Sequence, residues 1–148
     1  MNILVTGGAG YIGSHTCVEL LRAGHGVVAL DNLCNSSKEA IGRIEQAAGR
    51  GMAFQEADLL DSAALEKLFK ANKFDAVIHF AGLKSVGESC EKPLLYWRNN
   101  VGGTLNLVEA MLKHGVKDII FSSSATVYGS PESVPVSEEA PLKAINPY

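Results

Sequence analysis

Hydrophobic residues along the 148-residue chain alternate between two kinds of pattern. Short runs rich in β-branched residues are typical of buried strands, whereas apolar residues at every third or fourth position are typical of helices. The short runs predict strands at Ile3–Thr6, Val27–Leu30, Met52–Gln55, Ala76–Phe80 and Asp118–Ser122. The helical spacings predict helices at Gly13–Ala23, Ser37–Ala48, Ser62–Lys70 and, with proline in the first turn, about Pro93 to Lys113.

Asp61 could cap the third helix, whose Leu65, Leu68 and Phe69 are expected to face inward. In the fourth helix Leu105, Val108 and Leu112 recur at helical spacing. The fourth helix contains Gly102 and Gly103, each of which costs about 1 kcal/mol relative to alanine. Close packing against a cofactor or another helix would explain that cost, and a break in the helix is the alternative.

The order of the elements predicts the fold class. Strands that alternate with helices favour a parallel sheet that is covered on both faces. Because crossovers between parallel strands are right-handed, we expect a doubly wound α/β sheet with strand order 3-2-1-4-5. Residues 130–148 hold four of the five prolines, and this composition predicts a surface excursion.

Composition and charge exclude several classes of partner. The chain is 47% hydrophobic and 20% charged, as in ordinary globular proteins, and its net charge of -3 gives no reason to expect nucleic acid or an anionic membrane. No apolar run approaches the ~18 residues of a membrane span, and no basic leader precedes the first strand. Three widely spaced cysteines and four histidines without ligand spacing predict neither a disulfide set nor a metal site, and favour a cytoplasmic location.

Glycines crowd the turn between the first strand and the first helix. Gly7, Gly8, Gly10 and Gly13 satisfy both G-x-x-G-x-x-G and G-x-G-x-x-G. Such a turn lets backbone approach a pyrophosphate at a helix N-terminus, which is typical of Rossmann-type dinucleotide-binding domains. A P-loop is excluded because no lysine follows Gly13. A tight turn without a ligand is the alternative interpretation.

Three further polar residues stand at the ends of predicted strands. Asp31 closes the second strand, near the offset expected for a carboxylate that accepts from the adenosine ribose and repels a 2′-phosphate, so NAD is favoured over NADP. A helix cap or loop aspartate is the alternative. Asp58 follows the third strand and is either a partner of adenine or an ordinary loop carboxylate. His79 lies within an apolar run, which favours a satisfied, partly buried histidine over a catalyst.

Hydroxyl groups gather near the last predicted strand. Ser122, Ser123 and Ser124 end that strand, at the edge of the sheet where ligands of open α/β folds bind. Together with Tyr148 they suggest a proton relay, although strand-end hydrogen bonding alone would also account for the serines.

Several of these segments occur together in one known family. The chain resembles the extended short-chain dehydrogenase/reductase superfamily, and within it the N-terminal part of the nucleotide-sugar 4-epimerases. The resemblance runs along the whole chain and is carried by Gly7–Thr16, Asp31–Ser36, His79–Lys84, Asn99, Phe121–Gly129 and Asn146–Tyr148.

The resemblance implies a role for each matching residue. A pyrophosphate would meet the peptide groups of Tyr11 and Ile12 within the glycine turn, Asp31 would hold the adenosine ribose, and Ser124 and Tyr148 would act on the sugar as hydrogen-bond donor and general base. The remaining cofactor contacts that it implies are Asn32, Asn35 and Ser36 near the ribose, Asp58 and Leu59 beside adenine, and Phe80, Ala81, Gly82, Lys84, Asn99 and Ser122 on the nicotinamide side.

The implied reaction is the NAD-dependent interconversion of UDP-glucose and UDP-galactose through a 4-keto intermediate, by a cytoplasmic homodimer. Ala125 and Thr126 after Ser124 offer no carboxylate, which favours epimerisation over the elimination that related dehydratases perform. The resemblance also implies a lysine four residues after Tyr148, a sixth strand and a substrate domain beyond residues 1–148, so we expect these residues alone to be inactive. An epimerase of another nucleotide sugar and a non-catalytic NAD-binding module remain open alternatives.

Overall fold

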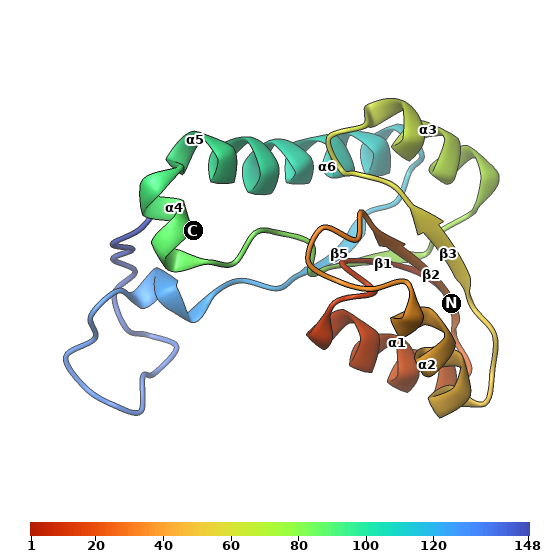
Figure 1. Ribbon diagram of the computed structural model, residues 1–148, viewed down its shortest axis with the longest axis horizontal. Coiled ribbons are helices and arrows are strands. Elements are labelled where there is room, and N and C mark those ends of the chain that lie inside the picture. The colour runs from red at the N-terminus through yellow and green to blue at the C-terminus, as the bar shows by residue number, and fades with distance from the viewer.

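A computed structural model describes all residues from Met1 to Tyr148. Its centre is a sheet of five parallel strands in the order β3-β2-β1-β4-β5, which confirms the predicted order (Figure 1). The strands are β1 Asn2–Thr6, β2 Gly26–Asp31, β3 Ala53–Glu56, β4 Ala76–His79 and β5 Asp118–Phe121. Each lies within one or two residues of its expected range.

Helices cover both faces of the sheet. Figure 1 shows α1 (Tyr11–Arg22) and α2 (Glu39–Ala48) on one face, and α3 (Ser62–Ala71) and α6 (Gly103–Lys113) on the other. Two separate clusters of buried residues form the core. Alternate residues of β1 illustrate why, since Leu4 packs toward α3 and α6 while Ile3 and Val5 pack toward α1 and α2. The central strands β1, β2 and β4 are therefore buried on both sides, whereas the edge strands β3 and β5 are largely exposed.

Two helix boundaries follow directly from capping chemistry. Asp61 accepts hydrogen bonds from the backbone N–H groups of Ala63 and Ala64 and so begins α3. A short helix that the spacing did not predict, α4 (Val86–Glu91), begins at Ser85, whose hydroxyl accepts from the N–H of Glu88. Six residues without an apolar period give no helical signal, and this explains why α4 was missed.

The predicted fourth helix is continuous but irregular. It begins as α5 (Pro93–Tyr96), widens into the π-helical turn η1 (Trp97–Gly102) and continues as α6. Gly102 and Gly103 do not break it. A Cβ at position 103 would lie 3.1 Å from the Leu59 Cβ, so the glycine permits close packing against the loop after β3, and not against another helix.

The apolar side chains whose spacing indicated this helix are not the ones that α6 buries most deeply. Leu105 and Leu112 are exposed, whereas Leu107, Ala110 and Met111 are buried against the sheet. The helix carries apolar residues on two sides, and the side with glycine and alanine is the one that can approach the sheet closely. By contrast, Leu65, Leu68 and Phe69 of α3 are all buried, as predicted.

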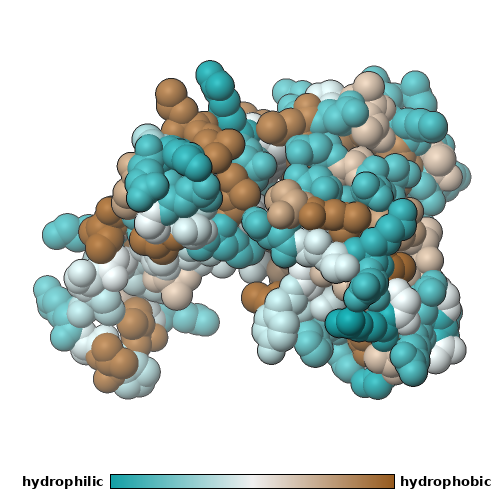
Figure 2. Space-filling view, in the orientation of Figure 1, coloured by the Kyte–Doolittle hydropathy of each residue, from teal (hydrophilic) through white to brown (hydrophobic).

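The chain after β5 makes a single 3₁₀ turn, η2 (Ala125–Tyr128), and then an excursion without helix or strand. The excursion closes on itself, because the N–H of Lys143 donates to the carbonyl of Val127. Figure 2 shows this part standing away from the main body, and Val134, Leu142 and Ile145 are exposed on it. The predicted surface excursion is confirmed. None of the helices in the molecule is both long and apolar enough to cross a bilayer.

Candidate functional site

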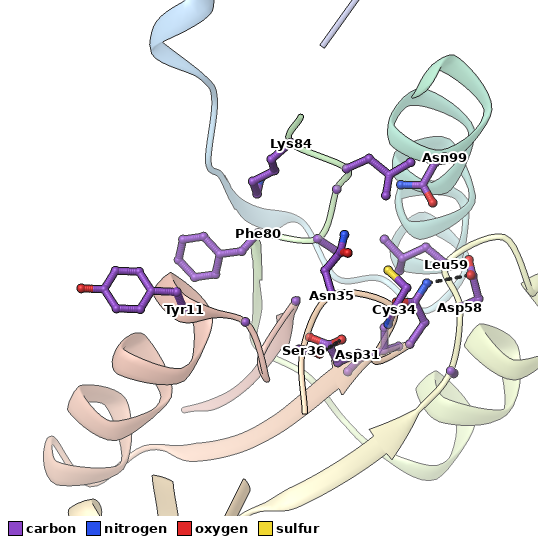
Figure 3. Close-up of a pocket in the computed structure, with 18 of the residues that line it drawn as sticks. Tyr11, Asp31, Cys34, Asn35, Ser36, Asp58, Leu59, Phe80, Lys84 and Asn99 are labelled. Atoms are coloured by element: carbon purple, nitrogen blue, oxygen red, sulfur yellow. Dashed lines mark hydrogen bonds between the residues drawn. The ribbon is translucent and has the colours of Figure 1, made fainter. Parts of the chain in front are cut away.

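The larger of two neighbouring cavities lies at the carboxyl ends of β1, β2 and β4, where the strand order reverses. Its volume is about 510 Å³, and crevices at this point are where open α/β sheets bind ligands. In Figure 3, Asp31 and Ser36 lie at its base, Asn99 reaches it from the helix and Lys84 from the loop after β4. The expected residues that line it are Gly7, Gly10, Tyr11, Asp31, Asn32, Asn35, Ser36, Asp58, Leu59, Phe80, Ala81, Gly82, Lys84 and Asn99.

The glycine turn is tightly packed, and the backbone of the turn and of the loop after β4 leaves no room for side chains on it. Gly7 has a φ of +68°, and a Cβ there would lie 2.8 Å from the Ala81 nitrogen. A Cβ on Gly13 would lie 2.1 Å from the Gly7 carbonyl oxygen. Gly13 therefore serves the packing of the turn, and neither Gly13 nor Ile12 lines the cavity.

The N-terminus of α1 presents unpaired hydrogen-bond donors beside this turn. No side chain caps the helix at Gly10, and no acidic residue lies in its first turn. The N–H groups of Tyr11, Ile12 and Gly13 have no acceptor in the chain, whereas the N–H of Ser14 already donates to Gly10. Three such donors and the positive end of the helix dipole suit a phosphate or pyrophosphate.

Asp31 holds two loops together at the base of the cavity. Its Oδ2 accepts from the N–H of Ala9 at 3.0 Å, and its Oδ1 accepts from the N–H of Leu33 at 2.9 Å and from the Ser36 hydroxyl at 2.8 Å. The residue is buried, with 8% of its surface exposed. Since a carboxylate offers about four acceptor sites, these bonds leave room for one further donor from a ligand.

The wall formed by the loop after β3 is held by polar contacts within the protein. Asp58 Oδ2 accepts from the Asn32 amide at 2.9 Å, and its Oδ1 accepts from the N–H of Leu60 at 2.8 Å. Asn106 of α6 donates to the carbonyl of Leu59 at 3.0 Å. Asp58 thus acts as a loop carboxylate that also lines the cavity. No group of three or more His, Cys, Asp or Glu residues is arranged to hold a metal ion.

His79 is fully buried, and both ring nitrogens have partners. Nδ1 faces the hydroxyl of Thr6 and Nε2 lies 2.9 Å from the hydroxyl of Thr104. The Thr104 hydroxyl donates to the carbonyl of Asn100, so it accepts from His79, which is then the neutral tautomer with hydrogen on Nε2. Burial, and then the charge of Lys84, lowers the pKa of His79 to about 4. The expected satisfied histidine is present, and it is more deeply buried than expected.

A second, smaller cavity of about 340 Å³ contains the expected hydroxyl groups. Ser122, Ser124 and Tyr148 line it, together with the unpredicted residues Tyr96 and Asn100. The Ser124 hydroxyl lies 2.8 Å from the Thr126 hydroxyl and accepts from the N–H of Thr126. No hydrogen bond joins Ser124 to Tyr148. The two side chains share a cavity, and the relay between them stays a prediction.

The two cavities meet at the loop that follows β4. Ala81, Gly82 and Lys84 line both of them. Lys84 is the only positively charged residue among the lining residues of either cavity. A ligand that extends from the glycine turn past this loop would reach the cavity that holds Ser124 and Tyr148.

Sequence reasoning missed part of the lining. In the larger cavity the missed residues are Leu30, Cys34, Ala57, Leu83 and Ser85. All five adjoin a predicted site residue in the sequence, so extending each predicted site by one position would have found them. Asn100 adjoins Asn99 and could have been found in the same way, whereas nothing in the spacing signals Tyr96.

Comparison with known proteins identifies close relatives. Residues 3–148 match the family described as the NAD dependent epimerase/dehydratase family. The chain is 62% identical over 148 residues to the UDP-glucose 4-epimerase of Bacillus subtilis (strain 168), covering 100% of this chain and 44% of that protein. It is 56% identical over 150 residues to UDP-glucose 4-epimerase 2 of Arabidopsis thaliana, covering 99% of this chain and 43% of that protein. The chain thus spans less than half the length of these curated relatives.

Solved structures agree with the sequence relatives. The UDP-glucose 4-epimerase of Bifidobacterium longum in complex with NAD⁺ and UDP superposes with a TM-score of 0.97 at 51% identity, covering 100% of this chain and 44% of that one. The enzyme of Stenotrophomonas maltophila, with bound NAD and formylated UDP-arabinopyranose, superposes with a TM-score of 0.95 at 51% identity, with the same coverage.

Proposed function

The chain belongs to the NAD dependent epimerase/dehydratase family, and we propose that the full-length protein carrying it interconverts UDP-glucose and UDP-galactose. The observation that carries the proposal is the meeting of the two cavities at Ala81, Gly82 and Lys84. One cavity has the donors for a dinucleotide, and the other has the hydroxyl groups for chemistry on a sugar. The names and bound ligands of the relatives support this assignment.

The residues of the larger cavity fit NAD. The unpaired N–H groups at the start of α1 suit the pyrophosphate, and the free acceptor site on Asp31 suits an adenosine ribose hydroxyl. The negative charge of Asp31 disfavours the 2′-phosphate of NADP. Asp58 and Leu59 would flank adenine, while Phe80, Lys84 and Asn99 would lie along the nicotinamide half. When bound, NAD supplies the capacity to take a hydride from a sugar carbon and return it.

The chain's own residues would move the proton. In the proposed reaction the Tyr148 hydroxyl, as its anion, takes the proton from the sugar hydroxyl at C4. Ser124 Oγ donates a hydrogen bond to the same sugar oxygen, after giving up its contact with Thr126. Lys84 places positive charge where the cavities meet, which attracts negatively charged groups of the ligand. Once the hydride has returned to the opposite face of C4, Tyr148 would give the proton back to the C4 oxygen, which completes the epimerisation.

Direct assay tests the function. Full-length protein, produced in a host that lacks its own epimerase, should carry NAD and convert UDP-galactose to UDP-glucose, followed by NMR of the anomeric protons. Extraction of the bound nucleotide identifies the cofactor. Parallel assays with N-acetylated and pentose UDP-sugars test the alternative substrates. NAD-loaded protein that leaves every UDP-sugar unchanged would contradict an epimerase and favour a non-catalytic NAD-binding module.

We further propose a cytoplasmic homodimer. Exposed apolar side chains run along one side of α5, η1 and α6, and include Leu94, Trp97 and Leu112. A stripe of this kind on a helix suits pairing with the same stripe of a second copy. Three unpaired cysteines support a reducing compartment. Sedimentation of the full-length protein tests the homodimer, with Leu112→Glu as the variant expected to disrupt it. Cell fractionation tests the cytoplasmic location.

A further inference from the structure

Tyr148 reaches the smaller cavity at the end of a long excursion. The chain leaves the cavity wall at η2, runs through residues 130–142 without helix or strand, and returns to line the cavity with Pro147 and Tyr148. In Figure 1 this excursion is the blue loop that stands away from the main body. Ser124 and Tyr148, the two residues proposed to act on the sugar, therefore lie on opposite sides of it in the sequence.

A single hydrogen bond ties residues 130–148 to the rest of the chain. The N–H of Lys143 donates to the carbonyl of Val127 at 2.8 Å, and every other hydrogen bond of residues 130–148 joins two members of that segment. Val127 itself lines the smaller cavity together with Tyr148. The tie therefore lies at the wall of the cavity and closes the base of the excursion.

Gly129 permits the two segments to approach at this tie. It has a φ of +60° and a ψ of -120°, a conformation that favours glycine, and its N–H donates to the carbonyl of Thr126 at 3.1 Å. A Cβ at position 129 would overlap the Lys143 carbonyl oxygen, and it would lie 3.4 Å from Ile145 Cγ2. Val127 and Gly129 thus form a clasp against the backbone of Lys143, and a side chain at position 129 would open it.

The clasp shortens the path between the two reactive hydroxyl groups. A long flexible connection such as residues 130–142 does not by itself fix where its ends lie, because closing it costs conformational entropy. With the clasp closed, only the segment after Lys143 separates the clasp from Tyr148, and only the start of η2 separates it from Ser124. Two short segments then place the hydroxyl groups relative to each other.

We propose that Gly129 is a positioning residue for Tyr148, because it keeps the clasp closed and so fixes how far the phenol can lie from the cavity wall. The effect on turnover rests on the proposed function. The structural part, that Gly129 keeps the N–H of Lys143 on the carbonyl of Val127, stands on the contacts alone.

Gly129→Ala in the full-length protein tests the clasp, with Gly115→Ala as the matched control. Gly115 also has a positive φ, +72°, but a Cβ there would meet nothing within 4 Å, and the residue lines neither cavity. Hydrogen exchange at the Lys143 amide should be about tenfold faster in Gly129→Ala, because the added Cβ moves this amide off its acceptor, and unchanged in Gly115→Ala. Equal exchange in wild type and Gly129→Ala would overturn the proposal.

The kinetic readout separates positioning of Tyr148 from binding of the ligands. In Gly129→Ala the kcat for UDP-galactose should fall by at least about tenfold, with KM and NAD affinity changed by less than about twofold, because Gly129 and Lys143 line neither cavity. Gly115→Ala should keep the wild-type kcat. A freed Lys143 amide with unchanged kcat would overturn the proposal, as would an equal loss of kcat in the control or a loss of NAD affinity that matches the loss of kcat.

Two insertions test the same geometry without changing the glycine, so they decide the proposal also where the alanine variant does not fold. A Gly-Ser pair inserted between the exposed residues Glu132 and Ser133 lengthens only the excursion, so kcat should stay within about twofold of wild type. The same pair inserted between Lys143 and Ala144 lengthens the segment from the clasp to Tyr148, and kcat should fall by at least about tenfold with NAD affinity retained. Equal effects of the two insertions would contradict a role for the clasp.

Exchange at the Lys143 amide separates failure of this proposal from failure of the proposed function. The exchange measurement needs neither cofactor nor turnover, so it decides the clasp in a protein of any activity. A wild-type protein without NAD or turnover would refute the proposed function, while faster exchange in Gly129→Ala would still support the clasp.

Discussion

Asp31 illustrates how one side chain can serve structure and recognition together. Its carboxylate receives three hydrogen bonds from the two loops that form the base of the larger cavity. The alternatives that the sequence left open, a ribose contact and a loop aspartate, are therefore compatible. The loop role is present in the structure, and the ribose role is a prediction that needs a variant able to separate the two.

Asp31→Asn is that variant, because its one remaining oxygen can still accept from Leu33 and Ser36, while the negative charge and the contact with Ala9 are lost. We expect the ratio of NAD to NADP affinity to narrow by roughly tenfold, since a 2′-phosphate no longer meets a carboxylate. Titration of both nucleotides into wild type and variant measures the ratio. Asp31→Ala should weaken binding of both nucleotides as well, through loss of the loop contacts. An unchanged ratio in Asp31→Asn would mean that the carboxylate does not select the cofactor.

Tyr148 carries the proposed proton transfer. Tyr148→Phe keeps the ring that lines the smaller cavity and removes only the hydroxyl. The rate of UDP-galactose conversion should fall by a factor of about 10² or more, whereas NAD affinity should stay within about twofold. Ser124→Ala should reduce the rate less, because a serine hydroxyl there assists the transfer without accepting the proton. Turnover near the wild-type rate in the phenylalanine variant would place the base elsewhere.

At the level of elements, a cluster of charges joins α3 to α6. Glu66 of α3 lies 2.9 Å from the Lys113 ammonium, 3.1 Å from that of Lys70 and 3.3 Å from Nε2 of His114. These partners, Lys113 first and Lys70 next, lower the pKa of Glu66 from 4.5 to about 2. The carboxylate is thus more acidic in the folded than in the unfolded chain, and its contribution to stability is present above about pH 4.5 and lost as the pH falls toward 2.

Glu66→Gln should remove this contribution. The free energy of unfolding should be lower than in wild type at neutral pH, and the two proteins should converge as the pH falls from about 4.5 to about 2. Urea unfolding across that range measures the difference. Glu39→Gln is the control, since Glu39 pairs with Arg43 on the exposed surface of α2 and exposed pairs contribute little. A constant difference between Glu66→Gln and wild type at every pH would refute the electrostatic explanation.

The elements also show what a hydrophobic pattern can and cannot predict. All five strands were predicted, because each is a short apolar run between polar turns, and α3 was predicted with its cap and its buried face. The side of α6 that faces the sheet could not be predicted, since Leu105 and Leu107 are equally apolar and only packing decides which of them is buried. The π-helical turn η1 has no apolar period of its own, so its redirection of Asn99 and Asn100 could not be predicted.

At the scale of the whole molecule, part of each cavity could be predicted from the sequence and part could not. Glycine spacing and strand ends predicted Gly7, Gly10, Asp31 and Asp58 of the larger cavity, because the chemistry at those positions follows from the fold, and the family resemblance supplied most of the other residues. Other features depend on hydrogen bonds between segments that are distant in sequence. These are the bonds of Tyr96 to Ser85, of Asp31 to Ala9 and of Asp58 to Asn32. Such contacts leave no trace in a local pattern.

Residues 1–148 produced alone should bind NAD but leave UDP-galactose unchanged. The donors of α1 and the carboxylate of Asp31 are present, whereas Ser124 is engaged with Thr126 and nothing in the chain orients the Tyr148 hydroxyl. Calorimetry with NAD tests the binding, and NMR of the UDP-sugar tests the absence of turnover. Turnover by this polypeptide at the rate of the full-length protein would show that its own contacts suffice.

The free edge of β5 should make the same polypeptide self-associate. β5 pairs only with β4, and Ile120 and Phe121 on it are 63% and 57% exposed. An apolar strand edge of this kind can pair with the edge of another copy, and a lysine on it opposes such pairing. Sedimentation velocity over a range of concentrations should show species larger than a dimer for residues 1–148, and their loss in Ile120→Lys.

Leu142→Lys adds the same charge at a position 74% exposed but outside any strand, so it should leave association unchanged. Equal effects of the two lysines would indicate that net charge, and not the strand edge, controls association.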